Sequence, residues 1–237
     1  MKTTGDLWSS KMDEGQSYWQ EFWDSFAKGS YDNVRLLPGN REMLGKINSC
    51  IKPGSYVLDA GCGSGNLSIL LAKEKKVAAV DFSDEMLRLA RKKGGGFQNL
   101  RFEKQDVTNL LFDDGTFDAV ASVNVIFNLD NYDAAISEFY RVLRPGGTVI
   151  ISSPLKGVEM NEELMQKVIS DCENSGADMG QVFSLLEHNK ALFSKGGMKF
   201  LPDESSMKLL LEKHGFQVQS TERVYYGCNL LVVGKKK

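Results

Sequence analysis

A glycine-rich turn near residue 60 has the residue types needed to bring the main chain close to a bound ligand. The stretch from Val57 to Gly65 reads Val-Leu-Asp-Ala-Gly-Cys-Gly-Ser-Gly, an apolar run that leads directly into three glycines at alternate positions. Glycine permits such an approach because a Cβ atom would clash with the ligand. Asp59 stands just before the turn, where its carboxylate would repel a pyrophosphate and attract a cationic amino group. The spacing therefore favours a ligand with an amino-acid group, and a dinucleotide is the alternative.

Two further carboxylates stand at the ends of predicted strands and could bind a nucleoside. Asp81 ends the run Val-Ala-Ala-Val-Asp, where a carboxylate can accept hydrogen bonds from both hydroxyls of a ribose. Phe82 and Met86 follow it and could supply apolar faces to an adenine. Asp106 ends the next run, where it could accept from the adenine amine while Val107 packs on the ring. Asp106 could instead cap the following turn through its own side chain.

Short apolar runs alternate with amphipathic segments, which indicates an α/β fold with a mostly parallel sheet covered on both faces. Strands are predicted at 56–59, 77–81, 100–103, 117–123, 148–152, 216–221 and 230–233. Helices are predicted at 13–26, 40–50, 66–73, 85–93, 132–143, 162–175, 181–193 and 207–214. Ser83 is expected to cap the fourth of these helices. Because parallel strands end at one edge of a sheet, the glycine turn and both carboxylates are expected to meet there.

Two more motifs complete a pattern that resembles a known superfamily. The run Phe-Asp-Ala-Val-Ala-Ser-Val-Asn ends at Asn124, and the turn Leu-Arg-Pro-Gly-Gly ends at Gly147. With the elements above, in this order and spacing, they resemble the class I S-adenosylmethionine-dependent methyltransferases over residues 50–153 and 203–234. The resemblance implies a Rossmann-like, seven-stranded, mostly parallel sheet with an antiparallel last strand. It also implies that S-adenosyl-L-methionine binds across the carboxyl ends of the strands.

The resemblance and the motifs together define a set of candidate contacts to this cofactor. The predicted cofactor-binding residues of the sheet region are Asp59, Ala60, Gly61, Cys62, Gly63, Asp81, Phe82, Met86, Asp106, Val107 and Asn124. An N-terminal helix covers the cofactor in many small-molecule members of the superfamily, so Tyr18 and Trp19 join this set. The other aromatic residues of that helix, Phe22, Trp23 and Phe26, are expected in the core.

The chain is expected to divide into a cap and a catalytic domain. Residues 1–50 form the predicted N-terminal helical cap, and residues 51–237 form the predicted methyltransferase domain. That domain carries a helical insertion at about 155–201, after the fifth strand, where strand periodicity is interrupted.

Cap and insertion are expected to close over the site as a lid. Leu185, Leu186 and Phe193 of the insertion are expected to wall off the acceptor and exclude water. His188 is the imidazole of the insertion and the candidate catalytic base for an acceptor that must lose a proton.

The composition limits the partners of the protein. Its 237 residues carry 29 basic and 31 acidic side chains, a formal net charge of −2, which gives no overall attraction to nucleic acid. The four cysteines and two histidines show no metal-ligand spacing, so no metal is expected. No apolar leader and no membrane-spanning run is visible, so the protein is expected to be cytoplasmic, without a membrane partner.

These observations predict transfer of a methyl group from S-adenosylmethionine to a small-molecule acceptor at N, O, S or C, by in-line displacement. The near-neutral charge and the helical insertion favour a small molecule as acceptor. An RNA-modifying methyltransferase, a nicotinamide-dependent oxidoreductase and a non-catalytic S-adenosylmethionine-binding protein are the alternatives. The sequence determines neither the acceptor nor the oligomeric state.

Overall fold

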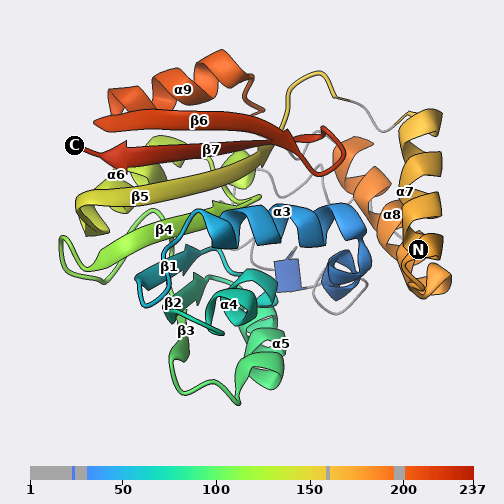
Figure 1. The fold of residues 1–237 in the computed structure, drawn as a ribbon, viewed down its shortest axis with the longest axis horizontal. Helices are drawn as coiled ribbons and strands as arrows, with labels where there is room; N and C mark the ends of the chain where they lie inside the picture. The colour runs from blue at the N-terminus through green and yellow to red at the C-terminus, as the bar shows by residue number, and fades with distance from the viewer. Residues whose placement is uncertain (1–22, 25–30, 159–160, 195–200) are drawn as a thin grey trace, which may run out of the picture.

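One seven-stranded sheet forms the centre of the protein (Figure 1). The computed structural model describes residues 23–24, 31–158, 161–194 and 201–237. The strands are β1 (Tyr56–Ala60), β2 (Lys76–Asp81), β3 (Leu100–Lys104), β4 (Phe117–Val123), β5 (Leu143–Pro154), β6 (Phe216–Val224) and β7 (Asn229–Lys236). Their order is β3-β2-β1-β4-β5-β7-β6, and β7 runs antiparallel to both of its neighbours while the other pairs are parallel. The predicted Rossmann-like α/β sheet is therefore confirmed.

Helices cover both faces of this sheet. One face carries α3 (Pro38–Ser49), α4 (Asn66–Leu71) and α5 (Asp84–Gly94). The other face carries α6 (Tyr132–Val142) and α9 (Glu204–Lys213). The remaining elements are the 3-10 turns η1 (Tyr31–Leu36) and η2 (Ile126–Asn128) and the helices α7 (Glu162–Asn174) and α8 (Met179–Ser194). Within the described ranges, none of the helices combines the length and the apolar character needed to cross a bilayer.

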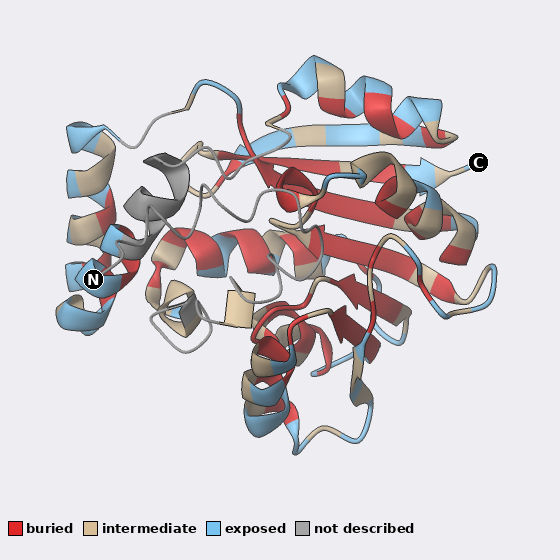
Figure 2. Ribbon diagram, turned by 180° about the vertical axis from the view of Figure 1, so that it is seen from behind, coloured by how far each residue is buried: buried red, intermediate tan, exposed pale blue. Residues whose placement is uncertain are grey.

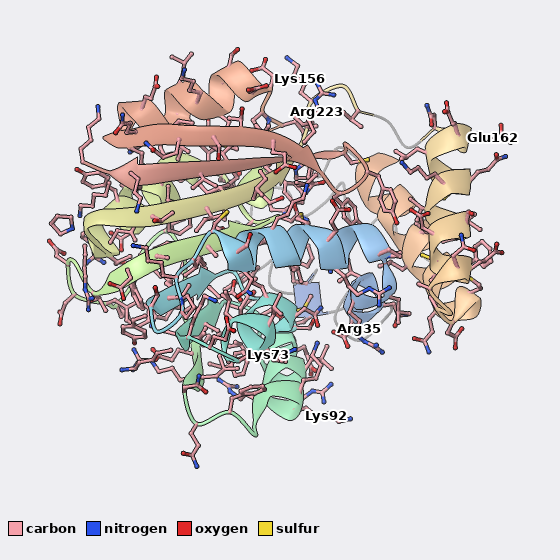
Figure 3. The ribbon with its side chains drawn as sticks, viewed as in Figure 1. Arg35, Lys73, Lys92, Lys156, Glu162 and Arg223 are labelled. Atoms are coloured by element: carbon pink, nitrogen blue, oxygen red, sulfur yellow. The ribbon has the colours of Figure 1, made fainter. Side chains whose placement is uncertain are left out.

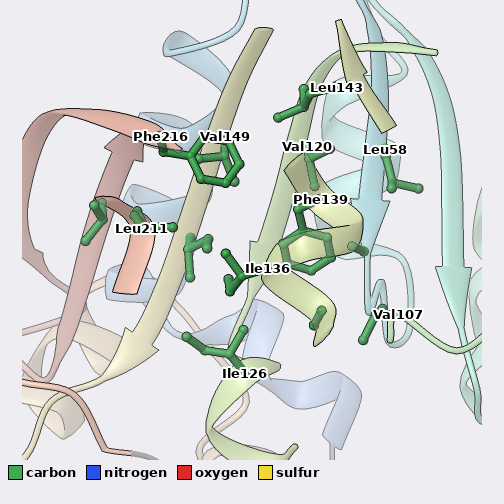
Figure 4. Packing of buried hydrophobic residues seen from close by; sticks show 14 of the residues in the cluster. Leu58, Val107, Val120, Ile126, Ile136, Phe139, Leu143, Val149, Leu211 and Phe216 are labelled. Atoms are coloured by element: carbon green, nitrogen blue, oxygen red, sulfur yellow. The ribbon is translucent and has the colours of Figure 1, made fainter. Parts of the chain in front are cut away.

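The central strands are apolar because helices exclude water from both of their faces. All residues of β1 after Tyr56 and of β2 after Lys76 are buried, as Figure 2 shows for the middle of the sheet. The face under α6 carries Leu58 and Val120, and Figure 4 shows Phe139 of α6 packed among these strand side chains. Burial of each large apolar side chain contributes about 1.5–3 kcal/mol to folding. The core therefore holds the strand ends rigidly in place.

The strand order reverses beside β1, and this reversal fixes the place of the site. β1 pairs with β2 on one side, with Ala60 opposite Val80, and with β4 on the other, with Asp59 opposite Ala121. The chain leaves β1 toward the face of α4 and leaves β4 toward the face of α6. A crevice opens where neighbouring crossovers diverge in this way. The glycine turn, the end of β2 and the end of β4 all meet there.

The helices that follow β5 pack with the N-terminal segment in an apolar cluster of their own. α7 and α8 lie beyond the carboxyl end of β5 (Figure 1), and Leu185 and Leu186 are buried in one cluster with Leu37 and Val168. Neither leucine lines the cleft described below, so the expectation that they wall off the acceptor is wrong in this structure. The physical reason is that the segment from η1 to α3 gives α8 a nearer apolar partner. Phe193 lies outside the side chains that the structure describes.

Most boundaries agree with the sequence prediction to within a few residues, and β5 differs most. It begins at Leu143 rather than Thr148, because Leu143 pairs with Phe117 before a register shift in β4. The predicted helix cap is confirmed, since Ser83 Oγ accepts from the Met86 amide at 3.1 Å. The 3-10 turn η1 was not expected, because its residues lack a helical apolar pattern.

An arginine ties α6 to the loop that enters β4. The Arg141 guanidinium donates to the backbone oxygens of Leu110 and Phe112, at 2.9 and 2.6 Å, and to the carboxylates of Asp114 and Glu138, at 2.8 and 2.7 Å. These partners use most of its donors, so Arg141 acts as a structural clamp. The neighbouring carboxylates also raise its pKa further above the usual range.

We expect Arg141→Ala to lower the free energy of unfolding by about 2–3 kcal/mol, because it leaves several partly buried acceptors unpaired. Arg144→Ala is the matched control: Arg144 stands three residues away, is 52% exposed and forms one ion pair with Asp118, worth less than about 1 kcal/mol. Urea unfolding followed by circular dichroism measures both variants. Equal losses in the two variants would contradict the clamp.

Candidate functional site

A cleft at the carboxyl ends of β1, β2 and β4 brings most of the predicted residues together. Five segments supply its described walls: the N-terminal segment at Trp23, the glycine turn, the end of β2 with the start of α5, the turn after β3 and the loop between β4 and α6. The lining residues in the described part of the chain are Trp23, Gly61, Gly63, Asp81, Phe82, Met86, Asp106, Val107, Thr108, Val123, Asn124, Val125, Asn128, Leu129, Asp130 and Asn131. Eight of the predicted residues are among them: Gly61, Gly63, Asp81, Phe82, Met86, Asp106, Val107 and Asn124.

The glycine turn is pinned to the end of β2 through its backbone. The amides of Gly61 and Cys62 both donate to the carbonyl oxygen of Val80, each at 2.8 Å. Gly61 has a φ of +78°, and a Cβ on it would lie 2.3 Å from Val125 Cγ2. Glycine is therefore required here both by the left-handed backbone and by the close approach of the β4–α6 loop.

Asp81 is the buried carboxylate of the cleft. Its Oδ2 accepts from the Gly63 amide at 2.8 Å, and its Oδ1 accepts from the Ser83 amide at 3.0 Å. Desolvation raises its pKa to about 6, although the backbone donors oppose this shift. Each carboxylate oxygen can accept a second hydrogen bond. The side chain can therefore hold the turn and still accept from the hydroxyls of a ribose.

Three predicted contacts lie behind the cleft wall instead. Asp59 is buried, and its Oδ2 accepts from Ser68 Oγ of α4 at 2.5 Å. Burial raises the pKa of Asp59 to about 7. Ala60 and Cys62 are also buried, and neither belongs to the described lining. The turn folds the side chains of these three residues toward the core, and their contacts with the cofactor stay a prediction.

An apolar side of the cleft suits a flat ring. Phe82 after β2, Met86 in the first turn of α5 and Val107 after β3 line it together. Asp106 lies beside them, and its Oδ1 accepts from the amide and the hydroxyl of Thr108, at 2.9 and 2.8 Å. Asp106 therefore caps the following turn, which was the alternative role considered for it from the sequence. It also lines the cleft.

The N-terminal segment reaches the cleft through a residue that was expected in the core. Trp23 lines the cleft. The neighbouring Asp24 accepts from the Ser83 hydroxyl and, at 3.3 Å, from the Glu85 amide at the start of α5. This carboxylate at a helix N-terminus anchors the segment beside the predicted ribose site. Tyr18 and Trp19 lie outside the described residues.

The loop between β4 and α6 forms the other half of the cleft. Asn124 turns the chain at the tip of β4 with a φ of +57°. Asn128 is buried, and its Oδ1 has no hydrogen-bond partner among the described residues. Leu129, Asp130 and Asn131 complete this half. A buried acceptor without a donor is costly, so a bound ligand or water that donates here would be stabilising.

Two further predictions concern a base and a metal. His188 lies in α8, and its side chain is outside the described part of the protein, so its role stays a prediction. Among the described residues there is no group of three or more His, Cys, Asp or Glu side chains placed to hold a metal ion.

We expect affinity for S-adenosylhomocysteine to fall as the pH drops through about 6. By this prediction, ionised Asp81 would accept from both ribose hydroxyls, whereas the protonated form would lose part of this capacity. With a pKa of about 6, the protonated form prevails at pH 5, so Kd should rise up to about tenfold relative to pH 7.5. Calorimetry at both pH values measures the change. Asp81→Asn is the control, since it cannot ionise and should bind weakly with little pH dependence; a wild-type Kd that is constant over this range contradicts the assignment.

The comparison with known proteins agrees with the geometry of the cleft. A family model described as a methyltransferase domain matches residues 57–147, from β1 to the turn inside β5. The demethylmenaquinone methyltransferase of Lactobacillus johnsonii is 32% identical over 200 residues, which cover 79% of this chain and 78% of that protein. That of Staphylococcus epidermidis strain RP62A is 35% identical over 104 residues, so this chain spans only 43% of its length.

A solved methyltransferase structure with a bound S-adenosyl compound shows the same fold. The magnesium protoporphyrin IX methyltransferase of Synechocystis PCC 6803, with bound S-adenosylhomocysteine, superimposes with a TM-score of 0.68. The two chains are 19% identical, and the match covers 94% of this chain and all of the other. The 32% sequence identity to the Lactobacillus protein extends over 79% of this chain. Together with the motifs and the sheet, it shows the family of the protein. The chain belongs to the class I S-adenosylmethionine-dependent methyltransferases.

Proposed function

We propose that the protein methylates a neutral, hydroxylated aromatic ring of the quinol kind at a ring carbon. The observation that carries this proposal is that the described lining of the half-cleft opposite the cofactor residues combines apolar side chains with carboxamides and holds no cationic side chain. The similarity to two proteins named demethylmenaquinone methyltransferases supports the choice of a quinol.

The described lining holds no lysine, arginine or histidine. A carboxylate or phosphate on the acceptor would have to leave water without a cationic partner, which is costly. Val123, Val125 and Leu129 offer apolar contacts, while Asn128 and Asn131 offer carboxamides. This combination suits a ring that carries hydroxyl groups and no charge.

The same lining argues against an RNA acceptor. Figure 3 shows labelled basic side chains on separate elements, Arg35 by η1, Lys73 after α4 and Lys92 on α5, all of them exposed. Lys156 and Arg223 are exposed in yet other regions. A phosphate backbone requires cations gathered along one surface, and none of these side chains belongs to the described lining of the cleft.

The residues of the first half-cleft fit S-adenosylmethionine. Asp81 would hold the ribose, Phe82 and Val107 would flank the adenine, and the turn at Gly61 leaves room for the amino-acid end. When bound, this cofactor supplies a methyl group on a positively charged sulfur. The protein then contributes orientation and a water-poor site.

The proposed reaction balances without an oxidant, because the acceptor enters in its reduced, quinol form. A hydroxyl of the acceptor gives up its proton, and the electron density moves to the adjacent ring carbon. That carbon forms a bond to the methyl group as the bond between methyl and sulfur breaks. The ring carbon then loses its hydrogen as a proton, and the hydroxyl is restored.

Asp130 is the proposed acceptor of the hydroxyl proton. Two other carboxylates of the described lining, Asp81 and Asp106, belong to the cofactor half. Asp130 follows η2 in the half that faces the acceptor, and its carboxylate can serve as a general base. His188 remains the alternative base.

We expect methyl transfer to a short-chain demethylmenaquinol kept reduced under nitrogen. With methyl-labelled S-adenosylmethionine, the label should appear on a ring carbon, as read by mass spectrometry and carbon NMR of the product. The dimethyl ether of the same quinol is the matched control, because it has the same ring but no hydroxyl to ionise, and it should remain unmodified. Label in added RNA, with salt-sensitive transfer, would instead support the RNA alternative. Cofactor binding without turnover on any acceptor would support the non-catalytic alternative.

We expect Asp130→Asn to lower kcat by at least tenfold, because general-base catalysis is lost while the side chain keeps its size. The Kd for S-adenosylhomocysteine should not change, since Asp130 is not part of the cofactor half. His188→Ala is measured in parallel and should retain its activity. The reverse result, full activity of Asp130→Asn with loss in His188→Ala, would assign the base to His188.

A further inference from the structure

The amino-acid end of the cofactor carries a carboxylate, and the described cleft offers it no cation. That end belongs beside the glycine turn, because the ribose and adenine positions lie at Asp81, Phe82 and Val107. Among the described lining residues, neutral donors are therefore the groups that can stabilise this carboxylate. Asn124 stands next to the turn, since its neighbour Val125 is the side chain that a Cβ on Gly61 would strike.

The side chain of Asn124 is held from behind by a residue of the last strand. Asn229, the first residue of β7, is 3% exposed, and its Nδ2 donates to Asn124 Oδ1 at 2.6 Å. The same Nδ2 donates to Ser152 Oγ of β5 at 3.2 Å. The Asn124 amide is fixed as well, because it donates to the Ser152 carbonyl oxygen at 2.8 Å.

This arrangement determines which end of the Asn124 carboxamide is free. Its oxygen points to Asn229, so its NH2 group is the end left for a ligand. Among the described residues, none accepts a hydrogen bond from Asn124 Nδ2, and Asn124 lines the cleft. Without Asn229, the two ends of the carboxamide could exchange places with little difference in shape.

We propose that Asn229 is a positioning residue that turns the NH2 group of Asn124 toward the cleft, where it donates to the carboxylate of the cofactor. Asn229 does not line the cleft and acts through Asn124. This assignment concerns cofactor recognition and does not depend on the identity of the methyl acceptor.

The test replaces Asn229 by aspartate, which has the same shape but presents acceptors in place of the NH2 donor. In Asn229→Asp, the Asn124 carboxamide should turn around and present its oxygen to the cleft. Calorimetry compares two probes, S-adenosylhomocysteine and its decarboxylated analogue S-adenosyl-3-thiopropylamine, which keeps the ammonium group. Affinity for the first should fall at least fivefold, whereas affinity for the second should not fall.

A double-mutant cycle separates positioning from loss of stability. Asn124→Gly removes the side chain and keeps the left-handed backbone unstrained. If Asn229 acts through Asn124, Asn229→Asp should have little further effect on either Kd in the Asn124→Gly background. Asn99→Ala is the control, because its carboxamide donates to the Ala72 and Lys75 carbonyl oxygens at 2.7 Å at the other end of the sheet; it should lower stability and leave both Kd values unchanged.

Two outcomes would overturn the proposal. Equal weakening of both probes in Asn229→Asp would indicate a general distortion of the cleft. Unchanged binding of both probes in a folded Asn229→Asp protein would show that the NH2 group of Asn124 does not serve the cofactor carboxylate, and a raised KM for the methyl acceptor would then assign it to that substrate. Failure of the acceptor assay affects neither measurement.

Discussion

The hydrogen bonds between the glycine turn and the end of β2 are the constraint on which the site depends. The carbonyl oxygen of Val80 accepts hydrogen bonds from the amides of Gly61 and Cys62, and the Asp81 carboxylate accepts one from the amide of Gly63. These bonds join two neighbouring strand ends into one backbone surface. The buried carboxylate of Asp81 is already paired with backbone donors in the structure. The site is therefore largely preformed. Burial raises the pKa of Asp81, and the backbone donors oppose this shift.

Local sequence was sufficient to predict eight of the residues that line the cleft. Predicted strands that end in a glycine turn or a carboxylate bring these residues to one edge of the sheet, so Gly61, Asp81 and Asp106 could be assigned to the cleft without knowledge of tertiary contacts. Asp59 shows the limit of this reasoning. It has the right type and position in the chain, but its side chain turns inward to Ser68. A motif gives the place of the backbone, whereas the direction of a side chain depends on what packs behind it.

Contacts between distant segments could not be predicted from the sequence. Asn229 lies 105 residues beyond Asn124, and nothing in the local pattern of β7 distinguishes it from any polar residue at the start of a strand. Trp23 has the helical spacing of a core residue and yet lines the cleft. Likewise, Asp32 of η1 accepts from Ser64 of the glycine turn at 2.7 Å and pairs with Lys93 of α5. The contacts of Trp23 and Asp32 depend on how the N-terminal segment folds back on the sheet, and that of Asn229 depends on how β7 pairs beside β5.

The left-handed backbone of Asn124 has a consequence for the range of side chains that this position can carry. Among the common amino acids, only glycine, asparagine and aspartate adopt such a conformation readily. Glycine would offer no side chain at all, and aspartate would bring a second negative charge near the carboxylate of the cofactor. Asparagine alone of the three supplies a donor. The main-chain geometry at the tip of β4 thus leaves asparagine as the one residue type that both fits this backbone readily and offers a side-chain donor.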